Sequence, residues 1–300
     1  MLAGVRSTTA KSYSSSQRGY IKFCRSLNLI PVPAEAETVL LYVTHLHNQS
    51  TSHGSIKVHL AAIRNLHIIN GYAPPDNSHP PLKMAIKAIQ DSTPAPSQKL
   101  PLTFEKIKLL WPLVKKDKNS KLWQAVLSLA FFAGLRCNEY AVSSTSSTQY
   151  APRVNSVSFL PNGVMKFKVV RSKTRIHGMT VTLGCSQVEI CAPCKMVNYL
   201  KSHEESHVKA DSFLFQLQGS PLTSSMVNCF IASLVQAAGW DSSLYSAHSL
   251  RAGAASSAAQ AGFQEWEFKK LGGWESKAYQ SYIREQDQAV AGFAKRLAVV

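Results

Sequence analysis

The chain has 300 residues, of which 45% are hydrophobic and 17% are charged, which is typical of a globular protein and excludes a disordered one. Its 33 Lys and Arg residues outnumber 17 Asp and Glu residues, which gives a formal net charge of +16. This charge favours a protein that binds a phosphate-bearing partner over a basic protein without one. No apolar run approaches the ~18–20 residues of a membrane span, and the first residues lack the apolar core of a secretory signal, so we expect an intracellular protein.

The N-terminal part, residues 1–92, carries helical patterns of apolar residues and is expected to form a small helical domain. Its helices are predicted over residues 8–27, 33–46, 52–69 and 82–89. The stretch 91–103 has three Pro and several small polar residues, as an extended linker does. We therefore assign residues 93–102 to a linker and residues 103–300 to a second domain.

The second domain is predicted to mix helices with a few strands. Thr103 is expected to cap its first helix, and residues 122–133 to form a strongly apolar, buried one. Asn162-Gly163 predicts a hairpin turn between the first two strands. The strands are predicted over residues 156–160, 164–170 and 180–183, and the later helices over 187–203, 222–238, 247–261, 264–271, 275–283 and from 286 onward. The expected fold class is mainly α, of the α+β kind, with a small antiparallel sheet.

The six Cys residues are few for this length and mostly lie among apolar neighbours, as in a protein that is kept reduced. Cys191 and Cys194 form a C-x-x-C pair, and Cys185 precedes them. A zinc site would need a fourth ligand, for which His203 and His207 are the candidates. Because a single C-x-x-C is a weak zinc signal, we expect reduced thiols and assign no metal.

Phosphodiester chemistry without a metal needs a nucleophile, cations around the non-bridging oxygens and an acid for the departing oxygen. Arg136, in GLRCNEY directly after the apolar helix, offers a guanidinium that binds phosphate in a bidentate manner. Glu139, three residues further on, is placed to orient it. The alternative is a surface ion pair at helical spacing.

Further basic groups occur at two places. His248 and Arg251, in AHSLRAGAASSAAQAG, share one helical face, and the small residues after them allow that helix to pack closely. Lys173, in VVRSKTR, is expected at a hairpin tip between the second and third strands, flanked by Arg171 and Arg175. The alternatives are a satisfied core His and a basic loop that only attracts phosphate.

Aromatic residues near the C-terminus supply the candidate nucleophile. Trp274 lies in LGGWES, and Tyr279 and Tyr282 lie three residues apart in KAYQSYIR, hence on one helical face. The alternative is a pair of core or interface aromatics. A phenol with a pKa near 10 is a poor nucleophile until strong positive charge surrounds it. We favour Tyr282 as the nucleophile and keep Tyr279 as the alternative.

In chain order these residues resemble the pattern of the tyrosine recombinase, or phage integrase, family: Arg136, Lys173, His248-x-x-Arg251, Trp274 and Tyr282. The similarity is most specific at GLRxxE, at HSLR with its small-residue helix and at LGGW followed by the Tyr segment, and it runs over nearly the whole chain. The segments LFQLQGSPLT, SLYSAHSLRAGAA and SKAYQSYIR look closest to recombinases of eukaryotic mobile elements, of the DIRS, Ngaro or Crypton kind.

The resemblance implies a role for each basic residue. Arg136 and Arg251 would bind the scissile phosphate. Lys173 would protonate the leaving 5′ oxygen, and His248 would assist proton transfer with Tyr282.

For two other residues the resemblance implies supporting roles. Trp274 occupies a position that is His in many relatives, and would hydrogen-bond phosphate through its indole N–H or support the nucleophile. Glu139 matches the family's acidic support residue. The gap between Trp274 and Tyr282 is one residue shorter than in many bacterial relatives, which weakens the assignment of the nucleophile.

The family resemblance also implies a helical, SAM-like core-binding domain followed by a catalytic domain, both bound to double-stranded DNA. The expected phosphate contacts are Lys22, Arg25, Lys57, Arg64, Arg171 and Arg175. The implied activity is site-specific recombination through a 3′-phosphotyrosyl intermediate, without metal, ATP or other cofactor, for integration or excision of a mobile element. A tetrameric synapse on DNA and a nuclear location are further expectations. The alternatives are a type IB topoisomerase and a domesticated DNA-binding protein without catalysis.

Overall fold

The computed structural model describes residues 7–93, 99–171, 177–204, 209–274 and 280. The chain divides into two compact units, residues 1–96 and 97–300, and the division falls inside the predicted linker. Among the described residues, no helix is both long and apolar enough to cross a bilayer.

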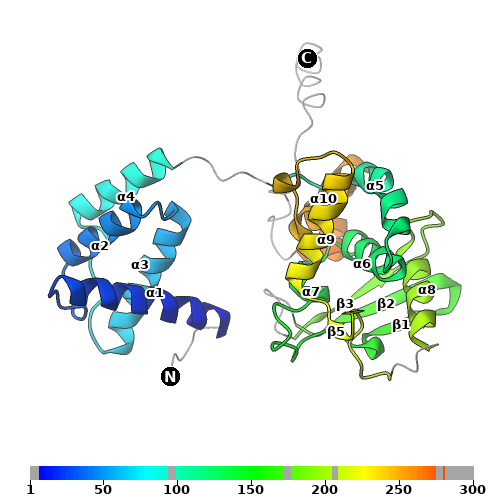
Figure 1. Cartoon of the computed structure of the whole chain (residues 1–300), viewed down its shortest axis with the longest axis horizontal. Coiled ribbons are helices and arrows are strands. Elements are labelled where there is room, and N and C mark those ends of the chain that lie inside the picture. The colour runs from blue at the N-terminus through cyan, green and yellow to red at the C-terminus, as the bar shows by residue number, and fades with distance from the viewer. Residues whose placement is uncertain (1–6, 94–98, 172–176, 205–208, 275–279, 281–300) are drawn as a thin grey trace, which may run out of the picture. The chain divides into compact units, whose positions relative to one another are not determined.

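The described residues of the N-terminal unit form four helices (Figure 1). They are α1 (Ser7–Ser26), α2 (Ala36–Asn48), α3 (His53–Ile69) and α4 (Pro80–Ser92). Helix α1 packs on α3, and α2 packs on α4. Their apolar faces meet in one core, which includes Tyr20, Val39, Ile56, Ile63 and Leu82. All four helices were predicted, because each carries a helical spacing of apolar residues long enough to define a face.

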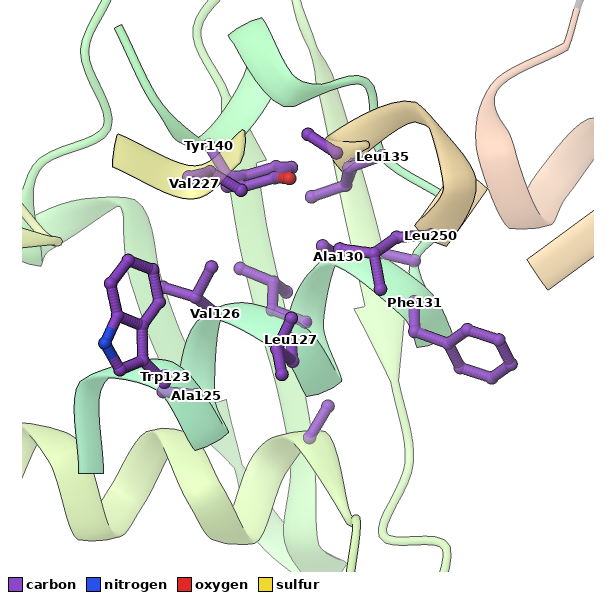
Figure 2. Close-up of a cluster of buried hydrophobic side chains, with 14 of the residues drawn as sticks. Trp123, Ala125, Val126, Leu127, Ala130, Phe131, Leu135, Tyr140, Val227 and Leu250 are labelled. Atoms are coloured by element: carbon purple, nitrogen blue, oxygen red, sulfur yellow. The ribbon is translucent and has the colours of Figure 1, made fainter. Parts of the chain in front are cut away.

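The second unit has a larger core around one buried helix. Its helices are α5 (Phe104–Lys116), α6 (Ser120–Phe132), α7 (Cys137–Tyr140), α8 (Ala192–Glu204), α9 (Ser224–Ala237), α10 (Ala247–Gln260) and α11 (Glu265–Gly272). Figure 2 shows Val126 and Leu127 of α6 in this core, together with Tyr140 of α7 and Val227 of α9. The predicted burial of this helix is confirmed, since nine of its residues are buried.

A three-stranded antiparallel sheet lies in this unit, in the order β1 (Val157–Leu160), β2 (Val164–Val169) and β3 (Met179–Leu183). Val157 pairs with Phe167, and Val169 with Met179. Asn162 and Gly163 both have positive φ, at 65° and 72°, which confirms the predicted hairpin turn. A mostly helical fold with small antiparallel sheets is therefore confirmed.

The structure departs from the predicted elements in three places. Helix α8 begins at Ala192, five residues after the predicted start at 187, because residues 184–191 are not helical. The short hairpin of β4 (Gln216–Leu217) and β5 (Ser220–Pro221) was not predicted, nor was α7. The helices predicted over 275–283 and from 286 lie outside the described residues.

The small residues of α10 allow the close packing that their sequence predicts. A Cβ added to Gly253 would lie 1.8 Å from the Leu102 carbonyl oxygen, so only glycine lets this stretch of backbone run against the helix. The Leu102 N–H donates to the Ser249 carbonyl at 2.9 Å, and the Phe104 N–H donates to Ser257 Oγ at 2.9 Å. These contacts attach the start of the second unit to α10, the helix that carries His248 and Arg251.

Candidate active site

The core of the second unit brings together the segments that carry the two predicted phosphate-binding arginines. Leu135 and Leu250 are fully buried, and both belong to the core around α6 (Figure 2). Arg136 and Arg251 are their neighbours in sequence. Packing of the two leucines therefore places both arginine backbones at the edge of one core.

Glu139 holds Arg136 through two contacts. Its Oε1 lies 3.0 Å from Arg136 Nη1, and its Oε2 accepts the Arg136 backbone N–H at 2.8 Å. The Glu139 side chain is 2% exposed, whereas that of Arg136 is 26% exposed. The shielded carboxylate therefore fixes the guanidinium while part of that group stays open to solvent. This arrangement agrees with the supporting role expected for Glu139.

Arg251 joins three segments of the unit. Its Nη1 donates to the Gly134 carbonyl and, at 3.0 Å, to the Gly272 carbonyl. Gly134 lies in the turn between α6 and α7, and Gly272 ends α11. The Arg251 side chain is fully buried. Its charge thus lies inside the unit, where it fixes the turn that leads to Arg136.

Trp274 packs directly against this arginine. The guanidinium carbon of Arg251 lies 4.1 Å from the centre of the Trp274 ring. A Cβ on Gly272 would lie 2.1 Å from the ring, and one on Gly134 would lie 3.3 Å from it, so both glycines make room for the indole. Trp274 is 2% exposed. Its burial favours support of Arg251 over direct contact of the indole N–H with phosphate.

His248 lies one turn before Arg251 on α10 and reaches the surface. Partial burial, followed by the positive charges of Arg251 and Arg136, lowers the pKa of the His248 imidazole below its ordinary value. Arg251 lies one turn further along the same helix, and Arg136, from a distant part of the sequence, lies near enough for its charge to act on the ring. A lowered pKa favours the neutral form of the imidazole.

Of the three basic residues predicted near the tip of the β2–β3 hairpin, Arg171 lies among the described residues, just after β2. Arg171 donates from Nη1 to the Tyr150 hydroxyl at 2.9 Å, and its guanidinium lies 4.8 Å from the centre of that ring. Sequence reasoning missed Tyr150, because an aromatic residue in a polar loop carries no periodic signal. Lys173 and Arg175, in the connection between β2 and β3, lie outside the described residues.

The four cations predicted in the N-terminal unit are all exposed. Lys22 and Arg25 lie one turn apart on α1, and Lys57 and Arg64 lie two turns apart on α3. Since α1 and α3 pack together, the four charges belong to neighbouring helices. Arg18, also exposed on α1 and one turn before Lys22, was not singled out from the sequence.

The sequence profile of the phage integrase family matches residues 101–289, which is more than half of the chain. The chain belongs to the phage integrase family. It is therefore a tyrosine recombinase, and the matched region includes every residue predicted to act in catalysis.

Relatives and solved structures agree with this membership. An integrase/recombinase XerD homologue of Selenomonas ruminantium is 26% identical to this recombinase over 263 residues, covering 84% of the chain and 74% of that protein. The Tn1549 transposon integrase in complex with transposon right-end DNA matches with a TM-score of 0.64 at 14% identity, over 99% of this chain and 95% of that one. A lambda integrase dimer bound to a COC′ core site matches with a TM-score of 0.61 at 14% identity, over 95% and 91% of the two chains. These two structures share the recombinase fold.

The structure thus brings together part of the set that the sequence predicted for the recombinase. Arg136, His248 and Arg251 converge, with Glu139 and Trp274 as their buried supports. The expected nucleophile Tyr282 and the alternative Tyr279 lie outside the described residues, as does Lys173. Their positions relative to the arginines remain predictions.

Proposed function

We propose that this recombinase breaks and rejoins duplex DNA at specific sites through a covalent bond between Tyr282 and a 3′ phosphate. The observation that supports this function is the convergence of Arg136, Arg251 and His248 at the edge of one core. Positive charge held by fixed side chains stabilises a phosphorane-like transition state more than it stabilises the starting diester. Such charge also makes a phenol effective as a nucleophile.

In the proposed reaction, the Tyr282 oxygen attacks the phosphorus and the bond from phosphorus to the 5′ oxygen breaks. The neutral His248 accepts the phenol proton, and Lys173 gives a proton to the departing 5′ oxygen. A 5′-hydroxyl from a partner duplex then attacks the phosphotyrosyl bond and releases Tyr282. The diester energy stays in the covalent bond, so the exchange consumes no ATP and needs no metal ion in the reacting centre.

Arg136 and Arg251 have different parts in this proposal. Arg136 is partly open and binds the scissile phosphate directly. Arg251 is buried, so its direct contact with phosphate requires the chain near Gly272 to shift when DNA binds. Before that shift, Arg251 contributes positive charge to the site and holds the Gly134 turn and the end of α11 in place.

The test is formation of a covalent adduct on a nicked suicide duplex, in buffer without Mg²⁺. Target half-sites are first selected from random duplex DNA, and the strand upstream of the cut carries a 5′ label. We expect the label to migrate with the protein on a denaturing gel. Intact DNA binding without any adduct contradicts the proposal. Relaxation of supercoiled plasmid by the monomer, without exchange between duplexes, indicates the topoisomerase alternative.

Six cations are proposed to bind DNA phosphates: Lys22, Arg25, Lys57, Arg64, Arg171 and Arg175. Removing one phosphate-binding cation lowers the slope of log affinity against log salt by about 0.9. We expect the double variant Lys57→Ala/Arg64→Ala to lower this slope by about 2. The matched control is Lys115→Ala, whose Nζ lies 2.7 Å from Glu189 and has no proposed role in DNA binding. Equal slopes for the two variants, measured by fluorescence anisotropy, contradict the assignment.

A tetrameric synapse on DNA is also proposed. An apolar hollow of about 400 Å³ lies among α5, α6, α10 and α11 and is lined by Phe104, Phe131, Phe132, Ala254 and Leu271, among others. The sequence at 289–300, AVAGFAKRLAVV, is apolar, and we propose that this segment of a neighbouring protomer occupies the hollow. Its deletion is expected to abolish tetramers on DNA in light scattering while monomer binding persists. Undiminished tetramer formation contradicts this proposal.

The biological setting that we propose is a eukaryotic mobile element of the DIRS, Ngaro or Crypton kind, whose recombinase acts in the nucleus. The support is the resemblance of LFQLQGSPLT, SLYSAHSLRAGAA and SKAYQSYIR to those recombinases. Two observations test this setting. We expect terminal repeats of such an element beside the coding sequence, and we expect the fluorescently tagged chain to lie in the nucleus. Flanking DNA without repeats, or exclusion from the nucleus, argues against it.

A further inference from the structure

Three of the six cysteines converge on the side of the catalytic unit where β3 leads into α8. Cys185 lies two residues after β3, Cys191 directly precedes α8, and Cys194 lies in the first turn of that helix. The sulfur of Cys185 is 3.6 Å from that of Cys194 and 3.6 Å from that of Cys191. All three sulfurs lie within 4.8 Å of one another, and all three cysteines are free of disulfides.

This spacing is that of ligands around one metal ion. Zinc–thiolate bonds are about 2.3 Å long, so neighbouring sulfurs at tetrahedral angles lie about 3.8 Å apart. A disulfide would instead place two sulfurs about 2.05 Å apart and leave the third without a role. The observed separations therefore fit three thiolates that share one ion.

One sulfur of this group lies inside the protein, and the other two lie at its surface. Cys191 is 1% exposed, whereas Cys185 and Cys194 are exposed. The group is therefore closed on the protein side and open to solvent on the other.

We propose that Cys185, Cys191 and Cys194 bind one Zn²⁺, with a water molecule as the fourth ligand. The sequence alone favoured reduced thiols, with His203 or His207 as the fourth ligand of any zinc site. The backbone of His203 lies on α8 nine residues after Cys194, about 13 Å along the helix axis. His207 lies outside the described residues. A solvent ligand agrees with the exposure of two of the three cysteines.

The proposed ion acts as a structural link between the sheet and α8. A Cβ on Gly163, in the turn between β1 and β2, would lie 3.2 Å from the Cys185 Cβ, so Cys185 lies beside this turn as well as just after β3. Helix α8 packs on α6, the helix that leads to Arg136. Zinc thus fixes the sheet, whose β2–β3 connection carries Lys173, against the helix that positions the arginines.

The test measures zinc in tag-free protein purified without chelators, before any DNA is added. We expect one zinc per chain by mass spectrometry, and intense visible absorption bands of tetrahedral Co²⁺ after exchange with cobalt. The Cys185→Ser and Cys194→Ser variants are expected to lose at least ten-fold in zinc affinity, as judged by competition with a chromogenic chelator. The matched control is Cys229→Ser, which changes an exposed cysteine on α9 outside the group.

Thermal unfolding separates a bound ion from an adventitious one. Zinc is expected to raise the Tm of the wild type and of Cys229→Ser, but not that of Cys194→Ser. Equal zinc content in Cys185→Ser and Cys229→Ser, or a disulfide within the group in freshly purified protein, overturns the proposal. Because no step measures DNA cleavage, a failure here is distinct from a failure of the proposed recombination.

Discussion

Replacing Tyr282 by Phe is expected to abolish the covalent protein–DNA adduct, with a fall in the cleavage rate of about 10⁴–10⁶-fold, as removal of a covalent nucleophile does elsewhere. Phe keeps the volume and planarity of the ring and removes only the oxygen that attacks phosphorus. DNA affinity and the Tm should therefore match those of the wild type. The measurement is the labelled suicide duplex on a denaturing gel, with binding checked by fluorescence anisotropy.

Tyr279→Phe is the matched control, because it removes the same atom from a tyrosine three residues away in the sequence. We expect this variant to keep the adduct. If Tyr279→Phe loses the adduct and Tyr282→Phe keeps it, the mechanism stands and the nucleophile is Tyr279. If both variants form the adduct, the assignment of Tyr282 as the one nucleophile is wrong.

Replacing Arg251 by Lys should lower the cleavage rate by about 10²–10³-fold, the range seen when one fixed donor to a developing negative charge is removed. Lysine keeps the charge but offers a compact ammonium on a flexible stem, which does not reproduce a planar fork stacked on Trp274. The carbonyls of Gly134 and Gly272 then lose a charged partner. We expect a loss of about 2–4 kcal/mol in the free energy of unfolding of the catalytic unit.

Trp274→Phe distinguishes the two roles considered for the indole. Phe retains an apolar face beneath the guanidinium but has no N–H. If the ring mainly supports Arg251, this variant loses some stability and keeps most of the cleavage rate. A fall in rate as large as that of Arg251→Lys at nearly unchanged Tm would instead assign the indole N–H to the phosphate. Denaturant unfolding and single-turnover cleavage provide the two measurements.

Local patterns predicted most of the secondary structure because their physical cause is local. A helical spacing of apolar residues led to α1, α3 and α6 within a few residues of their ends, and Asn162-Gly163 led to the β1–β2 turn. The start of α8 was placed too early, since the loop before it is ordered by contacts among cysteines and with the sheet. The β4–β5 hairpin was missed because strands of two residues have no period.

The sequence by itself determined that the fold is mainly helical. It also predicted two domains, and it contained the set of basic and aromatic residues that is typical of a tyrosine recombinase. These depend on spacing along the chain, and spacing is visible in the sequence. Only the tertiary structure decided that Arg251 lies buried on Trp274 beside the turn of Arg136, and that three cysteines share one place. The Arg251–Gly134 hydrogen bond joins residues 117 positions apart. Such a contact arises when several elements pack into one core, and no local pattern encodes it.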